Sequence, residues 1–184
     1  MPRPAAKCLV PVILPGIFTG ANVFDFPLLV ETIDAIAVHL HPDFDPGSMT
    51  LDVAVLEFPP GTFKVRPVRL AEQYYLDELD IRGVLYLRPV GLVGYGAQAL
   101  TNEGYVLTGY RSRGFSKVSG ITDNQMMITP TDVFDARIMP GDSGSPQFIS
   151  GRAVSLTSTA TAEPQRLQRL DIPEVMEFLA PFIE

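Results

Sequence analysis

The sequence of 184 residues contains one cysteine and two histidines. Cys8 cannot close a disulfide within the chain, and no Cys/His spacing suits a structural zinc ion, so neither device is expected to stabilise the fold. Positive charge is also scarce: 14 Lys and Arg against 21 Asp and Glu leave a net charge of −7. Because no basic stripe can neutralise phosphates, nucleic acid is not an expected partner.

Long hydrophobic runs are missing as well. No apolar segment approaches the ~20 residues that span a bilayer, so we expect no membrane-spanning segment. Arg3 and Lys7 precede the apolar segment 8–18 (CLVPVILPGIF), an order similar to that of a secretory signal peptide. Two prolines interrupt this segment and no small-residue cleavage site follows it, so a buried strand is the preferred interpretation.

Glycine and proline are abundant, with 15 and 17 residues, and 46% of the residues are hydrophobic. This hydrophobic fraction can bury enough surface to offset the entropy of ordering the chain. Apolar segments of strand length occur at 9–14, 35–40, 53–56, 83–87, 105–109, 126–128 and 153–156. Because turn residues separate nearly all of them, the sequence predicts an all-β body.

One of these segments, 35–41 (AIAVHLH), has a clear alternation. Ile36, Val38 and Leu40 share one face of the expected strand, and both histidines lie on the other. The alternation predicts a strand with a buried apolar face and solvated histidines.

Only the end of the chain has helical periodicity, with an apolar stripe at Val175, Phe178, Leu179 and Phe182. Asp171 and Glu174 resemble a capping box, and Pro173 suits a first helical turn. The sequence therefore predicts a short C-terminal helix. The acidic segment 70–81 (LAEQYYLDELDI) is interpreted as a connection between two β units with solvated carboxylates.

The strongest local pattern is segment 141–146 (GDSGSP). Gly141 and Gly144 allow a sharp turn that exposes the Ser143 hydroxyl and aims the N–H groups of residues 141 and 143 at one point. This arrangement predicts a nucleophile beside an oxyanion hole. The alternative interpretation is an ordinary surface turn.

This segment resembles the nucleophile signature of the trypsin/chymotrypsin-like serine peptidase family. Segments 41–44 (HPDF) and 51–56 (LDVAVL) are similar to the region of the triad aspartate, which implies that role for Asp52. By itself, an Asp at the start of a strand is more often a turn residue. Ser158 falls where the family has a serine that hydrogen-bonds this aspartate. Segments 65–70 (VRPVRL) and 94–96 (GYG) extend the resemblance, which covers 4–184.

The resemblance implies two packed antiparallel β-barrels and a C-terminal helix. Residues 1–70 would form an incomplete first barrel, because the family has opening strands before the position of Lys7. Residues 71–184 would form the second barrel and the helix. The family suggests a secreted or extracytoplasmic protein and a peptide or protein substrate, whereas the sequence itself leaves compartment and oligomeric state open.

The main departure from the family is Lys7. The family has its catalytic histidine in T-A-A-H-C, whereas residues 4–8 read PAAKC, and the separation from Lys7 to Asp52, 52 minus 7 or 45 residues, is that expected for the His and Asp. A coincidental match near an unrelated N-terminus is the alternative. Lysine is a poor general base because its ordinary pKa of ~10.4 keeps it charged, and Asp52 would favour the charged form. We therefore expect an ion pair that leaves Ser143 unactivated.

Neither remaining histidine is expected to replace the missing base. His39 and His41 precede Asp52 on the preceding strand instead of lying across the cleft. As metal ligands with Asp43 or Asp45 they lack a convincing third donor. We expect no metal and no other cofactor.

Two further departures concern Asp142 and the specificity pocket. The family neutralises the aspartate at 142 with a new N-terminus or an internal Arg, so either an Arg such as Arg137 pairs with Asp142 or the loop relaxes. Arg137 also falls at the floor of the pocket, and Ala160 replaces a pocket glycine. With Ser158 they form the predicted substrate-binding set. An Arg floor would prefer acidic side chains, unless Arg137 points elsewhere.

The expected function is that of a serine endopeptidase homologue that acts through Ser143, with little or no hydrolysis because Lys7 replaces the histidine. A non-catalytic module that binds peptides or proteins in the same cleft is the alternative from a different class. A third possibility is a fragment that does not fold stably by itself.

Overall fold

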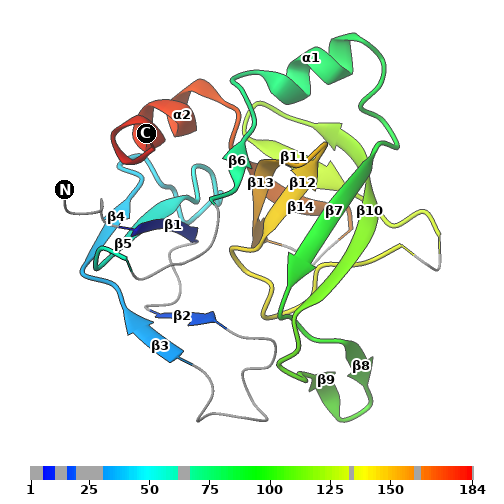
Figure 1. The fold of residues 1–184 in the computed structure, drawn as a ribbon. Helices are drawn as coiled ribbons and strands as arrows, with labels where there is room; N and C mark the ends of the chain where they lie inside the picture. Colours follow the sequence, from blue (N-terminus) through cyan, green and yellow to red (C-terminus); the bar gives the residue numbers. More distant parts are fainter. Residues whose placement is uncertain are drawn as a thin grey trace.

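The computed structural model describes residues 6–10, 16–19, 31–61, 67–132, 135–159 and 163–183; for 6–10, 16–19, 31–33 and 159 the backbone alone is described. The elements in chain order are β1 (Ala6–Val10), β2 (Gly16–Thr19), β3 (Glu31–Asp34), β4 (Ala37–Leu40), β5 (Ala54–Phe58), β6 (Arg69–Leu70), α1 (Tyr75–Ile81), β7 (Pro89–Gly94), β8 (Ala99–Thr101), β9 (Gly104–Val106), β10 (Ser112–Ile121), β11 (Gln125–Ile128), β12 (Pro146–Ile149), β13 (Arg152–Thr159), β14 (Gln165–Arg169), α2 (Pro173–Leu179) and the 3₁₀ turn η2 (Ala180–Phe182) (Figure 1).

The second half of the chain forms a closed antiparallel barrel. Its strands follow the order β12-β7-β10-β11-β14-β13, and the sheet closes because β12 also pairs with β13; β6 adds to β13 as a short parallel strand. The barrel interior is filled by large apolar side chains that include Leu85, Val90, Val118, Met126, Ile128 and Leu167. Closure leaves these six strands without a free edge, and the interior supplies most of the hydrophobic stabilisation.

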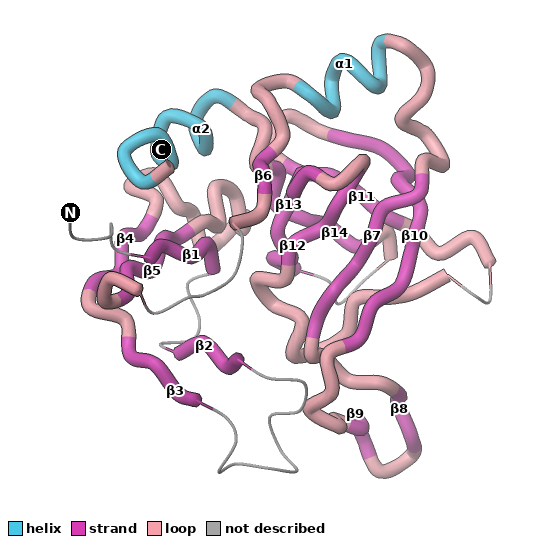
Figure 2. Tube along the Cα trace, viewed as in Figure 1, coloured by secondary structure: helices cyan, strands magenta, loops and turns pink. Residues whose placement is uncertain are grey.

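The first half forms smaller sheets beside the barrel. Strands β1, β5 and β4 make a three-stranded antiparallel sheet with β5 at the centre, and β2 pairs with β3. A second two-stranded sheet, β8 with β9, forms a hairpin that extends from the closed barrel (Figure 2). The predicted all-β architecture with a closed second barrel and a C-terminal helix is therefore confirmed.

A second apolar cluster joins the two halves. Val53 and Val55 pack with Leu156 of β13 and with Val175 and Leu179 of α2, all nearly fully buried. The apolar stripe that predicted α2 thus packs against residues of both sheets. Burial of each such side chain contributes roughly 1.5–3 kcal/mol to the free energy of unfolding, so this second cluster stabilises the packing of β5 against β13.

The orientation predicted for the strand at 35–40 was wrong. Val38 and Leu40 are 54% and 50% exposed, whereas His41 is 4% exposed. The His41 ring packs 4.9 Å from that of Phe178, its Nδ1 accepts from the Asp43 N–H, and its Nε2 lies 3.3 Å from the carbonyl oxygen of Glu174. Alternation identifies two faces but not which one is covered, and here aromatic side chains of the C-terminal helix cover the histidine face.

The segment interpreted as a connection contains a helix, α1. Its Leu76 and Leu79 are buried. The sequence analysis did not predict this buried face, because the segment is acidic and was expected to be solvated. The predicted capping box of α2 was also wrong: Ile172 is the N-cap residue, without a side-chain hydrogen bond, and Asp171 Oδ2 instead accepts from the Leu76 N–H at 2.7 Å. The strand expected at 83–87 is a turn before β7.

Among the described residues, none of the helices has the length and the apolar character that crossing a membrane would require.

Candidate active site

Asp52 is separated from the start of β5 by Val53 and is 2% exposed. The Ser158 hydroxyl donates to its Oδ2 at 2.7 Å, as the resemblance implied, and the Asp52 N–H donates to Gln168 Oε1 at 3.2 Å. The other carboxylate oxygen, Oδ1, is buried and accepts no hydrogen bond from any described residue. The carboxylate is thus fixed on one side and open to one more donor on the other.

The loop at 141–146, which was predicted to carry the nucleophile, has the sharp turn that its glycines predict. Gly141 and Gly144 have φ angles of +98° and +81°, a region where side chains are disfavoured. Ser143 is exposed. No hydrogen bond within the described chain uses the N–H groups of Gly141 and Ser143, or the Ser143 hydroxyl. Two free N–H groups beside an exposed hydroxyl are what an oxyanion hole requires.

Strand β13 connects the Asp52 carboxylate to this loop. The carbonyl of Thr157 accepts from the Gly144 N–H at 2.9 Å, and the Thr157 N–H donates to the Ser145 carbonyl at 3.0 Å. The next residue, Ser158, holds Asp52. Consecutive residues of one strand therefore bind the two predicted catalytic segments, which brings them to the same part of the molecule.

Gln147, which the sequence analysis did not predict, stabilises the loop at 141–146 through hydrogen bonds. Its side chain is fully buried; Nε2 donates at 2.8 Å to the Ser145 carbonyl and to Thr157 Oγ1, and Oε1 accepts from the Ser155 hydroxyl at 2.8 Å. A buried network in which each group is satisfied rigidifies its surroundings. The sequence analysis predicted no strand at 146–149, so it gave no signal for this buried glutamine.

Asp142 turns its carboxylate toward the segment 94–96. Oδ1 accepts from the Gly96 N–H at 2.7 Å and Oδ2 from the Met139 N–H at 2.9 Å. A Cβ atom on either Gly94 or Gly96 would overlap this carboxylate, which explains both glycines of the GYG segment. The predicted pairing with Arg137 does not form, because Arg137 binds Glu163 instead.

Burial raises the pKa of Asp142, while its hydrogen bonds from the Met139 and Gly96 N–H groups act in the opposite direction. No described cation neutralises this carboxylate. Among the described residues, the donors to this carboxylate are backbone N–H groups, and it lines a pocket of about 450 Å³ together with Gly96 and Ser145.

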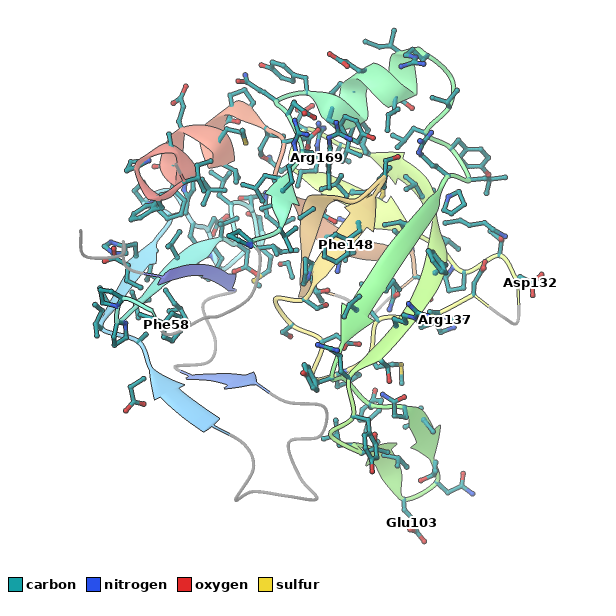
Figure 3. All side chains as sticks on the ribbon, viewed as in Figure 1. Phe58, Glu103, Asp132, Arg137, Phe148 and Arg169 are labelled. Carbon is teal, nitrogen blue, oxygen red and sulfur yellow. The ribbon has the colours of Figure 1, made fainter. Side chains whose placement is uncertain are left out.

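The predicted pocket residues are only partly described. Arg137, labelled in Figure 3, is exposed. It forms an ion pair with Glu163, which precedes β14. Ala160 lies outside the described residues. Gln165, which the sequence analysis also did not predict, is buried. Its Oε1 accepts from the Ile138 N–H at 3.0 Å, and its Nε2 donates to the Ile138 carbonyl at 2.7 Å. The expected preference for acidic substrate side chains depended on an unpaired Arg137, and the ion pair with Glu163 removes that basis.

For Lys7, the structure describes the backbone but not the side chain. In the antiparallel pairing of β1 with β5, Lys7 is opposite Glu57. Glu57 is five residues from Asp52 (57 minus 52), a chain length of at most about 17 Å. The register does not bring the backbone of Lys7 directly beside Asp52.

The two histidines have structural contacts away from Ser143. His39 Nε2 lies 2.9 Å from Glu57 Oε2, and its ring packs 4.8 Å from that of Phe182. His41 packs on α2 as described above. The described part of the chain contains no cluster of three or more His, Cys, Asp or Glu residues that could hold a metal ion.

Among the comparisons with known proteins, only those with solved structures find similar proteins. No family model and no curated protein matches the sequence. Human heparin binding protein has a similar structure, with a TM-score of 0.74, 14% identity, and coverage of 98% of this chain and 82% of that one. A mutant of that protein (TM-score 0.76, 15% identity, 98% and 82% coverage) and granzyme C (0.73, 15%, 97% and 82%) are comparable. At such low identity the likeness establishes the trypsin/chymotrypsin-like fold alone.

Proposed function

We propose that the protein is a serine endopeptidase homologue in which Ser143 occupies the position of the nucleophile and Asp52 that of the triad carboxylate. The N–H groups of Gly141 and Ser143 form its oxyanion hole. The observation that carries the proposal is the hydrogen bonding of β13, which holds Asp52 through Ser158 and the nucleophile loop through Thr157. The proposed ligands are peptide or protein chains.

Hydrolysis is expected to be absent or weak. A serine hydroxyl needs an adjacent base to become a good nucleophile, and no described side chain hydrogen-bonds Ser143 Oγ. Loss of the histidine from a serine triad lowers kcat by up to about 10⁶-fold. The oxyanion hole and substrate binding alone retain about 10³–10⁴-fold over water, which sets the residual activity to look for.

A non-catalytic peptide- or protein-binding module is the alternative. The braced, exposed loop favours it, because Gln147 and Thr157 maintain the geometry of a site for which no base is described. A polyanion such as the one named for heparin binding protein is a poor candidate ligand, since the net charge of this chain is −7.

A fluorophosphonate probe separates the two functions. The endopeptidase homologue is expected to be labelled slowly and with one probe per chain, and Ser143→Ala is expected to abolish labelling. A purely binding module remains unlabelled but retains affinity for peptides, measured by calorimetry against a peptide library. Labelling that persists in Ser143→Ala would remove Ser143 from the proposed role.

The role of Lys7 needs its own variant. If Lys7 occupies the position of the histidine, Lys7→His supplies a base with an ordinary pKa near ~6.5 and labelling accelerates by orders of magnitude. An unchanged rate would exclude Lys7 from the site and leave the proposal for Ser143 and Asp52 intact.

A further inference from the structure

His41 is a buried titratable residue that the proposed function does not use. It directly follows β4 and is 4% exposed. The C-terminal helix α2 lies beside this end of β4 (Figure 1), and the ring of its Phe178 is 4.9 Å from the His41 ring. The contacts of the two ring nitrogens therefore bear on how α2 is held.

The hydrogen bonds of His41 select one neutral form of its imidazole ring. The Asp43 N–H donates to Nδ1 at 3.2 Å, so Nδ1 carries no proton. The proton of the neutral ring is therefore on Nε2, which lies 3.3 Å from the carbonyl oxygen of Glu174 in the first turn of α2. The neutral ring thus accepts from the loop after β4 and donates to α2.

A second proton on the ring disrupts this arrangement. It has to occupy Nδ1, where it meets the Asp43 N–H, so two donors face each other and their hydrogen bond is lost. The charged ring would also be buried against Phe178, whose ring attracts a cation less strongly than the water that it excludes. Protonation therefore disfavours the position that His41 has beside α2.

The acidic groups on the elements around His41 do not compensate for this cost. They are Asp43 on the loop, Asp52 and Glu57 on the β5 segment, and Glu174 and Glu177 on α2. Those on the loop and on α2 are exposed, so water screens their charge. Those on the β5 segment bind Ser158 and His39. Among the described residues, none of these carboxylates forms an ion pair with His41.

Helix α2 depends on its tertiary contacts. It has seven residues, and a helix of this length is not stable in water without packing. Its Val175 and Leu179 are buried in the cluster that contains Val53, and the His41 ring contacts its outer turn. Loss of one of these few contacts is therefore expected to weaken the docking of the whole helix.

We propose that His41 makes the docking of α2 sensitive to protons: the neutral ring holds the segment 173–182 on β4 and β5, and protonation of the ring releases it. Histidine changes its charge between about pH 5 and 8, so release occurs as the pH falls through this range. Because the docked state binds fewer protons than the released state, its stability rises with pH. Release uncovers the apolar cluster that includes Val53 and Val55.

His39 provides a matched control two residues away. Its side chain is 37% exposed, and its Nε2 lies 2.9 Å from Glu57 Oε2. Its protonated form gains an ion pair with Glu57, which is weak because it is exposed to water. Acid therefore strengthens the contact of His39 slightly, whereas it breaks that of His41.

The equilibrium constant of unfolding, measured by denaturation between about pH 8 and 5, tests the proposal. The comparison is with His41→Asn, which keeps an acceptor for the Asp43 N–H but cannot be protonated. Relative to this variant, the wild type is expected to lose stability as the pH falls, by up to about tenfold in that constant per pH unit. Relative to His39→Asn, the wild type should gain stability slightly or show no difference. The same pH dependence in the wild type and in His41→Asn would refute the proposal.

NMR of the wild type tests the proposal even where His41→Asn does not fold. The ring signals of His41 should place the proton of the neutral form on Nε2. Hydrogen exchange, corrected for its intrinsic pH dependence, should show about tenfold lower protection of the Met176 N–H at pH 5 than at pH 7, because its bond to the Ile172 carbonyl belongs to α2. The Val118 N–H of the barrel, which donates to the Arg88 carbonyl, should remain protected. A charged His41 ring beside a protected α2, or an equal loss of protection in α2 and the barrel, would overturn the proposal.

Discussion

Asp171 and Asp142 are two carboxylates of the second barrel that differ in what holds them. Asp171 is fully buried, and its oxygens accept from Arg169 Nε at 2.9 Å, from Arg169 Nη2 at 3.1 Å, and from the Leu76 N–H. Asp142 has two backbone N–H groups and no described cation.

The two carboxylates therefore differ in the charge that surrounds them. The pair of Asp171 with Arg169, which also binds Asp77 of α1, joins β14 to α1 and to the turn before β11 through Thr122. The charge of Asp142 is uncompensated by any described cation, and its carboxylate accepts from two backbone N–H groups instead. The geometry of the loop at 141–146 therefore depends on the absence of a Cβ atom at Gly94 and Gly96 and on the ionisation of Asp142.

The largest expected effect comes from breaking the compensated site. Arg169 is 2% exposed, and Arg169→Met would leave the Asp171 carboxylate buried without its cation. Removal of one partner of a buried ion pair typically lowers the free energy of unfolding by about 3–5 kcal/mol. Chemical denaturation followed by circular dichroism measures this change.

Arg69→Met is the matched control. Arg69 forms an exposed ion pair with Glu72 at 3.0 Å, and because water and salt screen such pairs, its loss is expected to change the free energy of unfolding little. Similar losses in the two variants would show that the charge of Asp171 does not need Arg169.

Much of this molecule was predictable from local patterns. Segment 141–146 predicted a turn because its glycines need positive φ, and the stripe at 175–182 predicted α2 because four apolar residues share one helical face. Helix α1 could not be predicted, because its stability comes from packing of Leu76 and Leu79 and from the distant Asp171 carboxylate. Local sequence does not contain that partner.

The candidate site divides in the same way. The Ser158–Asp52 hydrogen bond followed from the resemblance, since both residues match its segments. The partners of Asp142 did not, because they are backbone N–H groups of Gly96 and Met139, and backbone donors leave no trace in side-chain identity. The pairing of Arg137 with Glu163 likewise joins residues that are 26 positions apart, which local sequence does not reveal.

A smaller effect is expected from crowding the uncompensated site. Gly96→Ala introduces a Cβ that overlaps the Asp142 carboxylate, and overpacking of this kind lowers stability by about 1–3 kcal/mol. The displaced loop should also slow labelling of Ser143 by the fluorophosphonate probe. Gly91→Ala, whose Cβ would meet its neighbours at an ordinary 3.7 Å, is the control and should preserve both quantities.

The smallest effect is a difference in pH dependence between Asp142→Asn and the wild type. Burial raises the pKa of Asp142 above 3.8, so the folded state favours its protonated form. Its contribution to stability is fully present below pH 3.8 and is lost as the pH rises through the raised pKa. The free energy of unfolding of the wild type minus that of Asp142→Asn should therefore fall with rising pH in this window. Asp45→Asn provides a control of opposite sign, because the Ser48 hydroxyl and the Gly47 N–H lower the pKa of Asp45, and the same difference should rise with pH. Parallel curves for wild type and Asp142→Asn would mean that the nucleophile loop is insensitive to the charge at 142.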